Sequence, residues 1–325
     1  MTKLPRISVV MPVYNGMPYL PHAVESILQQ TFEDFELILV DDASSDGSFP
    51  YLHSLNDPRI VMIRNPKNLG ITGALNVGLE KVRGEFIARL DQDDIALPSR
   101  LARQVALLER NASLGLIGSS CISIDGDGVV GKEVLMGKND AELRWRMLFK
   151  NPFVHSTVMM RTSILRDNGL KYESLFGEDF LLWLKILKYT KGHIINEPLI
   201  YYRMHSNNVT SSKKEFQDKA LKEYLGQAME DIMGHRPDLD WMEFTLWARG
   251  IKQVVGPTEM IYAKFYLSLL KHFAMRYSTG LDKGFFKNSL MTLRSRLKWS
   301  TYYSFKLYRF RKSIAPYFHP TTIAG

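Results

Sequence analysis

The chain has 325 residues, 45% hydrophobic and 23% charged, a composition typical of a soluble globular protein with one or two domains. Its single cysteine, Cys121, excludes an internal disulfide and a zinc site built on cysteines, and it fits a reducing compartment. No segment approaches the roughly 20 uninterrupted apolar residues of a membrane span. The apolar run at the N-terminus is also too short for a signal peptide. We therefore expect a cytoplasmic protein.

The net charge of +8 lies in the C-terminal region. Residues 281–325 contain nine Lys and Arg residues and one acid, Asp282, so the preceding 280 residues carry 33 of each sign. The positive charge therefore belongs to the tail and tells us nothing about the rest of the chain.

Strands and helices alternate along the first 110 residues. Buried strands are predicted at residues 7–11, 35–40, 60–63 and 86–90, and helices near residues 19–30, around Leu75 and Leu79, and from Pro98 through Leu108. This alternation predicts βαβ units, an α/β fold and a parallel sheet. Further along, strands are predicted at residues 114–125, 155–161 and 194–203, and helices at 141–150, after Asp179, at 213–233 and beyond Pro237.

Polar clusters follow three of the predicted strands, at Tyr14-Asn15, at Asp41-Asp42 and at Asp91 to Asp94. If the strands are parallel, the three loops leave the same edge of the sheet, where ligands bind in open α/β folds. Three carboxylates within four residues repel one another and need water, hydrogen-bond donors or a cation. The alternative is a solvated acidic turn in which Asp94 caps the next helix. The chain has neither a dinucleotide-binding glycine motif nor a phosphate-binding Gly-Lys-Ser/Thr loop.

Several motifs together resemble glycosyltransferase family 2, whose members have the GT-A fold. They are PVYNG at residues 12–16, DDASSDGS at 41–48, NLG and ALNVG within 68–78, and LDQDD at 90–94, followed by GED at 177–179 and YRMHSNN at 202–208. The resemblance covers about residues 5–210. It implies a Rossmann-like, mostly parallel central sheet flanked by helices in a catalytic domain of residues 1–212. Residues 213–325 would form a helical, basic appendage.

The resemblance also implies a nucleotide-diphosphate sugar as donor, with a UDP-sugar as the first expectation, and Mn²⁺ or Mg²⁺ as cofactor. Asp93 and His205 would hold the metal, although His205 could instead belong to an ordinary surface loop. Asp42 would hydrogen-bond the base. The donor-binding residues implied are Pro12, Tyr14, Asn15, Asp42, Asn76, Asp91, Gln92 and Arg203.

Asp179 is the candidate general base, at the start of a helix that is apolar nearly all round. Glu178 would be its structural partner. The alternative is that both acids only stabilise the helix N-terminus. His155 receives no role, because a lone histidine beside a strand is more often structural.

We therefore expect a metal-dependent inverting glycosyltransferase acting on a saccharide or lipid-linked saccharide in cell-surface polysaccharide synthesis. A sugar-nucleotidyl transferase and a non-catalytic nucleotide-sugar-binding protein are the alternatives. The basic, aromatic tail at residues 281–318 suggests peripheral attachment to an anionic membrane surface at the inner face of the plasma membrane. The alternative is a helix packed on the protein with a solvated basic face. Nucleic acid is not an expected partner.

Overall fold

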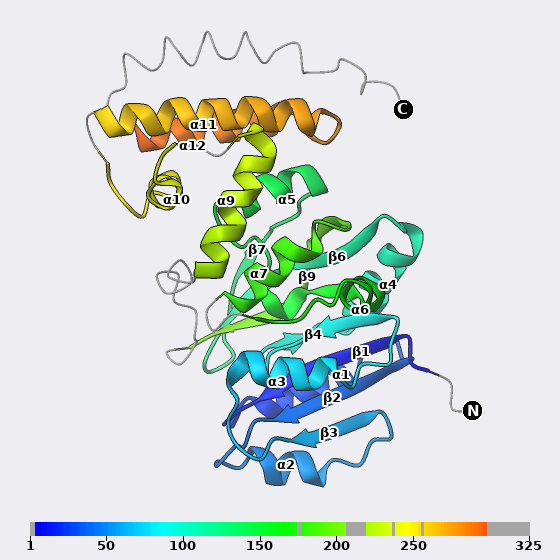
Figure 1. Ribbon diagram of the computed structural model, residues 1–325. Helices are drawn as coiled ribbons and strands as arrows, with labels where there is room; N and C mark the ends of the chain where they lie inside the picture. Colours follow the sequence, from blue (N-terminus) through cyan, green and yellow to red (C-terminus); the bar gives the residue numbers. More distant parts are fainter. Residues whose placement is uncertain (1–3, 174–176, 206–218, 236–237, 255–256, 298–325) are drawn as a thin grey trace. The chain divides into compact units, whose positions relative to one another are not determined.

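The computed structural model describes residues 4–173, 177–205, 219–235, 238–254 and 257–297. The chain forms two compact units (Figure 1). The first comprises residues 1–138 and 152–218, and the second comprises residues 139–151 and 219–325. Residues 139–151 thus belong to the second unit, whereas the predicted division at 212/213 places them in the first.

The first unit is built on a mixed sheet in the order β3-β2-β1-β4-β8-β6-β9-β5, with β7 paired to β6. Strands β1, β2, β3 and β4 are mutually parallel, β8 is antiparallel to both its neighbours, and β9 is parallel to β6. The C-terminal ends of β1, β2, β4, β6 and β9 therefore lie at one edge. The strands are β1 Ile7–Val13, β2 Phe35–Asp41, β3 Ile60–Arg64, β4 Phe86–Arg89, β5 Ile95–Ala96, β6 Leu114–Asp125, β7 Val130–Val134, β8 Met159–Arg161 and β9 Lys191–Met204.

Helices cover both faces of this sheet. The helices of the first unit are α1 Leu20–Leu28, α2 Ser48–Ser54, α3 Gly70–Leu79, α4 Arg100–Arg110, α6 Thr162–Asp167 and α7 Glu178–Ile186. Helices α1 and α4 bury apolar stripes against alternate residues of β1 and β2, in one core cluster. Helix α3 packs on the opposite face, where a Cβ at Gly78 would lie 2.6 Å from Cγ1 of Val10. That position therefore requires glycine.

Two local predictions are wrong, the strand at residues 155–161 and the start of the next helix at Pro98, and the alternative in which Asp94 caps that helix is excluded. The strand expected at residues 155–161 is divided into a 3-10 turn at His155–Thr157 and the short strand β8. Asp94 does not cap α4, because β5 lies between them and pairs with β9, and the N-cap residue is Ser99. Pro98 accordingly precedes the helix and is not part of its first turn.

The second unit consists of helices around an aromatic core, as the expected helical appendage implies. The helices are α5 Asp140–Met147, α9 Lys219–Met233, α10 Trp241–Arg249, α11 Pro257–Arg276 and α12 Lys283–Arg296. Trp145 of α5 packs edge-on against Tyr266 of α11 and Phe285 of α12. Edge-to-face aromatic pairs of this kind stabilise a core beyond their buried area.

Part of the apolar face of the predicted membrane segment is buried in this core. Leu290 and Leu293 of α12 are buried within it, so these two residues are not available to a membrane. Lys287 and Arg294 are exposed. The rest of the predicted segment, residues 298–318, lies outside the described residues. Among the described helices, none combines the length and apolar character needed to cross a bilayer.

Candidate active site

The loops after β1, β2 and β4 meet at one edge of the sheet, as predicted from the parallel strands. The backbone N–H of Tyr14 donates to Oε1 of Gln92 (2.8 Å), and the Tyr14 carbonyl accepts from Nε2 of Gln92 (3.1 Å). Asn15 joins the first loop to the second, because its Oδ1 accepts from the backbone N–H of Ser45 (2.8 Å). Asn15 has a φ of 49°, in the left-handed region that asparagine tolerates.

Two predicted donor-binding side chains thus hold the loops together. Both polar atoms of the Gln92 amide bind the backbone of Tyr14, and Oδ1 of Asn15 binds the loop after β2. The Tyr14 ring is exposed on this edge. Pro12 is buried in β1 beside Val40.

Asp42 is almost fully buried and fastens the segment before α3. Its carboxylate accepts from the Asn65 amide (2.7 Å) and from the backbone N–H of Leu69 (2.9 and 3.0 Å). A carboxylate has about four acceptor positions, so these contacts leave capacity for a further donor. Asn76 of α3 exchanges two hydrogen bonds with the backbone of Tyr172, at 2.8 and 3.0 Å. Its amide therefore fixes the chain ahead of α7.

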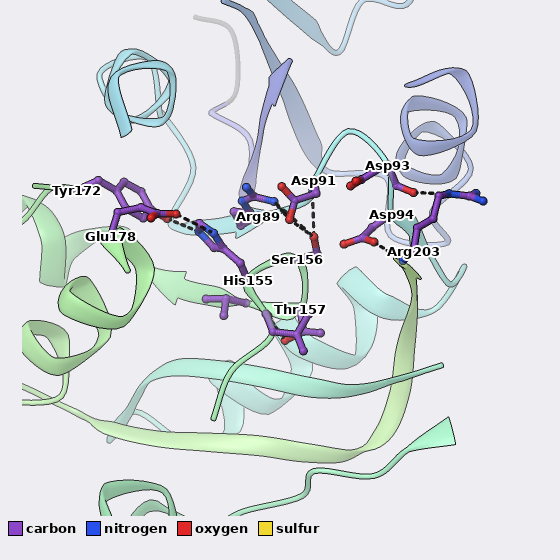
Figure 2. A network of polar contacts seen from close by, with 12 residues as sticks. Arg89, Asp91, Asp93, Asp94, His155, Ser156, Thr157, Tyr172, Glu178 and Arg203 are labelled. Atoms are coloured by element: carbon purple, nitrogen blue, oxygen red, sulfur yellow. Dashed lines mark hydrogen bonds and ion pairs between the residues drawn. The ribbon is translucent and has the colours of Figure 1, made fainter. Parts of the chain in front are cut away.

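The acid cluster follows β4. One carboxylate oxygen from each of Asp91, Asp93 and Asp94 lies within 4.8 Å of the others. Asp91 is held from below, because its Oδ2 accepts from Nη1 of buried Arg89 (2.5 Å) and from Oγ of Ser156 (2.8 Å). The Asp91 N–H donates back to the same Ser156 oxygen (2.9 Å), as Figure 2 shows.

Asp93 and Asp94 are contacted by the end of β9. Oδ2 of Asp93 lies 2.8 Å from Nε2 of His205, whose ring packs on Tyr19. The backbone N–H of Arg203 donates to Oδ1 of Asp94 (2.8 Å).

The guanidinium of Arg203 is buried rather than exposed toward a ligand. It donates to the carbonyl oxygens of Asp93 (2.9 Å), Asp125 (2.9 Å) and Gly126 (3.3 Å), and it lies over the Tyr19 ring. Arg203 therefore locks β9 to the acidic loop. In these contacts it binds backbone oxygens, and its place among the donor-binding residues stays a prediction.

The electrostatics of the cluster fit a divalent cation. Burial, with the negative charges of Asp91 and Asp93, holds the pKa of Asp94 well above its ordinary value. Burial and the Asp91 charge also raise the pKa of Asp93. Oδ2 of Asp94 is buried and has no hydrogen-bond partner among the described residues. Oxygen ligands of this kind suit Mg²⁺ and Mn²⁺, so the cluster can bind such an ion.

Two further acids lie at the N-terminus of α7. Gly177 precedes the helix with φ of 70°, a left-handed conformation that favours glycine, and Glu178 and Asp179 follow in the first turn. Burial and the Asp179 charge raise the pKa of Glu178 to about 7. Nδ1 of His155 lies 3.9 Å from Oε1 of Glu178, and Nε2 of His155 lies 3.0 Å from the Tyr172 hydroxyl (Figure 2).

Four residues of this network received no role from the sequence: Arg89, His155, Ser156 and Tyr172. One of them carried a signal, because Arg89 interrupts an otherwise apolar buried strand, and a buried cation requires a partner. The other three had none. Their positions depend on the 3-10 turn before β8 and on the chain ahead of α7, neither of which follows a periodic pattern.

Comparison with known proteins agrees with this geometry. Residues 8–169 match the model of the family described as "Glycosyl transferase family 2". The chain is 35% identical over 222 residues to "Putative glycosyltransferase EpsE" of Bacillus subtilis (strain 168), covering 65% of this chain and 77% of that protein. It is 32% identical over 229 residues to the Escherichia coli "UDP-Glc:alpha-D-GlcNAc-diphosphoundecaprenol beta-1,3-glucosyltransferase WfgD", covering 69% and 87%.

The fold is similar to that of S. aureus TarS 1–349, crystallised with UDP-GlcNAc. The TM-score is 0.59 at 17% identity, over 93% of this chain and 92% of that one. At that identity the similarity concerns the fold, and it shows the GT-A arrangement expected from the motifs. The edge of the sheet, the family match and the relatives lead to one conclusion: the chain belongs to glycosyltransferase family 2 and is a glycosyltransferase with the GT-A fold.

Proposed function

We propose that this enzyme is metal-dependent and inverting, and that it moves a sugar from a UDP-sugar to a hydroxyl of a lipid-linked saccharide during cell-surface polysaccharide synthesis. One observation carries the proposal. The acid cluster after β4 and Glu178, which precedes Asp179 at the start of α7, belong to one polar network that includes Arg89, Ser156 and His155 (Figure 2). Such an arrangement suits a donor diphosphate on one side and a proton acceptor on the other.

The names of relatives support the choice of substrates. WfgD is named for a UDP-Glc donor and a GlcNAc-diphosphoundecaprenol acceptor, and a further relative is named "Amylovoran biosynthesis glycosyltransferase AmsE" (Erwinia amylovora). Two TarS structures are described as complexes, one with UDP-GlcNAc and one with UDP. By this comparison, a nucleoside diphosphate would lie on the loops after β1, β2 and β4.

Each side chain then has a defined task. Asp93, Asp94 and His205 would hold Mn²⁺ or Mg²⁺, and a bound divalent ion stabilises the charge of the departing diphosphate. Asp91, fixed by Arg89 and Ser156, would contact the ribose or the sugar. Asp179 would take the proton from the acceptor hydroxyl as it attacks the anomeric carbon from the face opposite the diphosphate.

The remaining predicted donor-binding residues divide into two groups. Pro12, Tyr14 and Asp42 would line the base and ribose. Asn15, Asn76, Gln92 and Arg203 would act by positioning, since their polar groups bind the backbone of neighbouring segments.

A donor screen tests the proposal. Purified enzyme is incubated with UDP-, GDP- and dTDP-sugars, a synthetic GlcNAc-diphospholipid acceptor, and Mn²⁺, Mg²⁺ or EDTA, and nucleoside diphosphate release is measured. We expect metal-dependent, acceptor-stimulated release from a UDP-sugar. In Asp179→Asn, which has the same shape but cannot accept the proton, kcat should fall about 10²- to 10⁴-fold while UDP binding is kept. Release that is equal in EDTA, or a loss of only a few-fold in Asp179→Asn, would contradict the assignment.

A further inference from the structure

His155 is enclosed by side chains from several segments of the first unit. Its Nε2 lies 3.0 Å from the Tyr172 hydroxyl, and its Nδ1 lies 3.9 Å from Oε1 of Glu178. The ring also packs edge-on against Trp183 of α7, with 5.7 Å between ring centroids. Tyr172 is itself fixed, because Asn76 binds both its N–H and its carbonyl oxygen. The imidazole therefore lies between a rigid support and the first turn of α7.

The surroundings define the state of this imidazole. Burial, together with the positive charge of Arg89, lowers the pKa of His155 well below its ordinary value, so the ring is neutral at physiological pH. Burial raises the pKa of Tyr172, so the phenol keeps its proton. A neutral imidazole has one N–H and one acceptor nitrogen. If the phenol donates to Nε2, the proton of the ring is on Nδ1, which faces Glu178.

We propose that His155 is a positioning residue for sugar transfer. Anchored on Tyr172, it directs an Nδ1–H at the Glu178 carboxylate and so orients the turn of α7 that carries Asp179. This inference rests on the proposed function in so far as Asp179 is the general base. At 3.9 Å the contact with Glu178 is an electrostatic one, longer than a hydrogen bond.

The residue after His155, Ser156, contacts the donor side of the site, so the position of this turn affects both sides. Ser156 binds the side chain and the backbone N–H of Asp91, on the donor side of the site. Two consecutive residues of one short turn therefore contact the donor-side acid Asp91 and the first acid of α7, Glu178, as Figure 2 shows. A displacement of this turn would move both sides of the site together.

Glu178 is sensitive to such a contact. Burial and the Asp179 charge raise its pKa to about 7, Arg89 opposes this, and the Asp91 charge adds to it. Glu178 is therefore divided between its two protonation states near neutral pH. A donor on Nδ1 of His155 favours the ionised state, and removing that donor should raise the pKa of Glu178 further. An ionised Glu178 in turn favours proton uptake by Asp179, because one of two adjacent negative charges is then neutralised.

Two substitutions of His155 distinguish the contribution of its Nδ1 from that of its Nε2. In His155→Asn the amide N–H can occupy the place of Nδ1, while in His155→Gln the amide reaches the place of Nε2 and leaves Glu178 without a donor. With a UDP-sugar and the GlcNAc-diphospholipid acceptor, we expect kcat within about threefold of the parent for His155→Asn. For His155→Gln we expect a fall of up to about tenfold, because an electrostatic contact longer than a hydrogen bond contributes no more than a hydrogen bond to a charged group. The acid limb of the kcat profile should move to higher pH in His155→Gln, and UDP binding should be unchanged in both variants.

The controls separate positioning from folding. His193 of β9 is another partly buried histidine with a lowered pKa, outside this network, and His193→Asn should change neither kcat nor the pH profile. Tyr172→Phe, which removes only the hydroxyl that anchors the ring, should lower kcat with UDP binding kept. Equal losses in His155→Asn and His155→Gln with an unmoved acid limb would overturn the proposal, as would a loss confined to UDP binding.

A readout without turnover keeps this inference distinct from the proposed function. The Glu178 carboxyl is titrated by ¹³C NMR in the parent and in both His155 variants, and Glu178→Gln assigns the signal. The midpoint should rise in His155→Gln and stay near the parent value in His155→Asn. If no donor supports transfer but the midpoint moves in this way, the proposed function fails and the contact of His155 with Glu178 stands. An unmoved midpoint in His155→Gln refutes the contact whatever the activity.

Discussion

Replacing Ser156 by alanine tests whether the donor-side acid is held in place by the turn before β8. The Ser156 hydroxyl donates to Oδ2 of Asp91 (2.8 Å) and accepts from the Asp91 N–H (2.9 Å), and the residue is fully buried. Ser156→Ala removes both contacts without adding volume. Asp91 should then lose its fixed orientation, and the affinity for UDP and for the donor should fall.

The magnitude follows from what remains after the substitution. A hydrogen bond to a charged group contributes about 1.5–3 kcal/mol, and a backbone N–H left without a partner costs about 1–3 kcal/mol. Arg89 still pairs with the Asp91 carboxylate at 2.5 Å, so the carboxylate keeps one charged partner. The lower end of each of the two ranges therefore applies. We therefore expect a loss of about 2.5 kcal/mol, or roughly 60-fold in Kd, since about 1.4 kcal/mol corresponds to a factor of ten.

Calorimetric titration with UDP in the presence of Mn²⁺ measures this loss directly. Ser120→Ala is the matched control, because Ser120 is also a fully buried serine whose hydroxyl binds backbone groups, in β6 and outside the polar network. It should reduce stability without changing Kd. A Kd for Ser156→Ala within twofold of the parent would show that Arg89 alone orients Asp91, and the reasoning would be wrong.

Three further predictions concern other parts of the chain. Asp93→Ala should abolish the metal-dependent activity and leave the thermal unfolding temperature almost unchanged, as measured by scanning fluorimetry; full activity with Mn²⁺ would remove Asp93 from the metal site. Asp42→Ala should weaken UDP binding more than it lowers kcat at saturating donor, because it releases Asn65 and Leu69 from the loop before α3; unchanged donor KM would contradict this. Residues 281–318 should attach the protein to anionic vesicles at low salt. Flotation of the full chain with anionic and with neutral liposomes measures this attachment. Equal recovery with both kinds of liposome would contradict the prediction.

Much of the sheet edge could be predicted because chain order and strand direction determine it. The apolar runs of β1, β2 and β4 are followed at once by polar residues, and parallel neighbours bring these loops together. The helices α1, α3 and α4 likewise follow from periodic apolar positions. Here the pattern of the sequence and the structure depend on the same physical cause, the burial of one face.

The division of labour within the site could not be predicted in the same way. Arg203, Gln92 and Asn76 have the chemistry of ligand-binding residues, yet their polar groups bind the backbone of segments distant in sequence. Only the three-dimensional arrangement shows which donors and acceptors are already used. The roles of Ser156 and His155 were hidden for a further reason. A continuous strand would direct consecutive side chains to opposite faces, whereas the 3-10 turn lets both enter one network.

The charge balance beneath the acid cluster explains why the fold should not depend on a metal. Arg89 is buried next to Asp91. Burial acts to lower the pKa of Arg89, but the charge and hydrogen bond of Asp91, together with Tyr172 and Asp94, leave that pKa above its ordinary value. Buried Arg100 donates to the carbonyl oxygens of Arg89 and Val158, and burial lowers its pKa to about 9, so it is still charged at neutral pH.

Two buried cations therefore lie near three carboxylates, and much of the mutual repulsion is offset by the protein itself. A donor diphosphate would bring further negative charge to this edge. Arg89 and Arg100 already offset the charge of the carboxylates, so they would not also offset that of the diphosphate. By the proposed function, a divalent ion would be needed to accommodate the diphosphate, whereas the edge of the sheet would form without it. This is why the loss of Asp93 should remove activity and spare the fold.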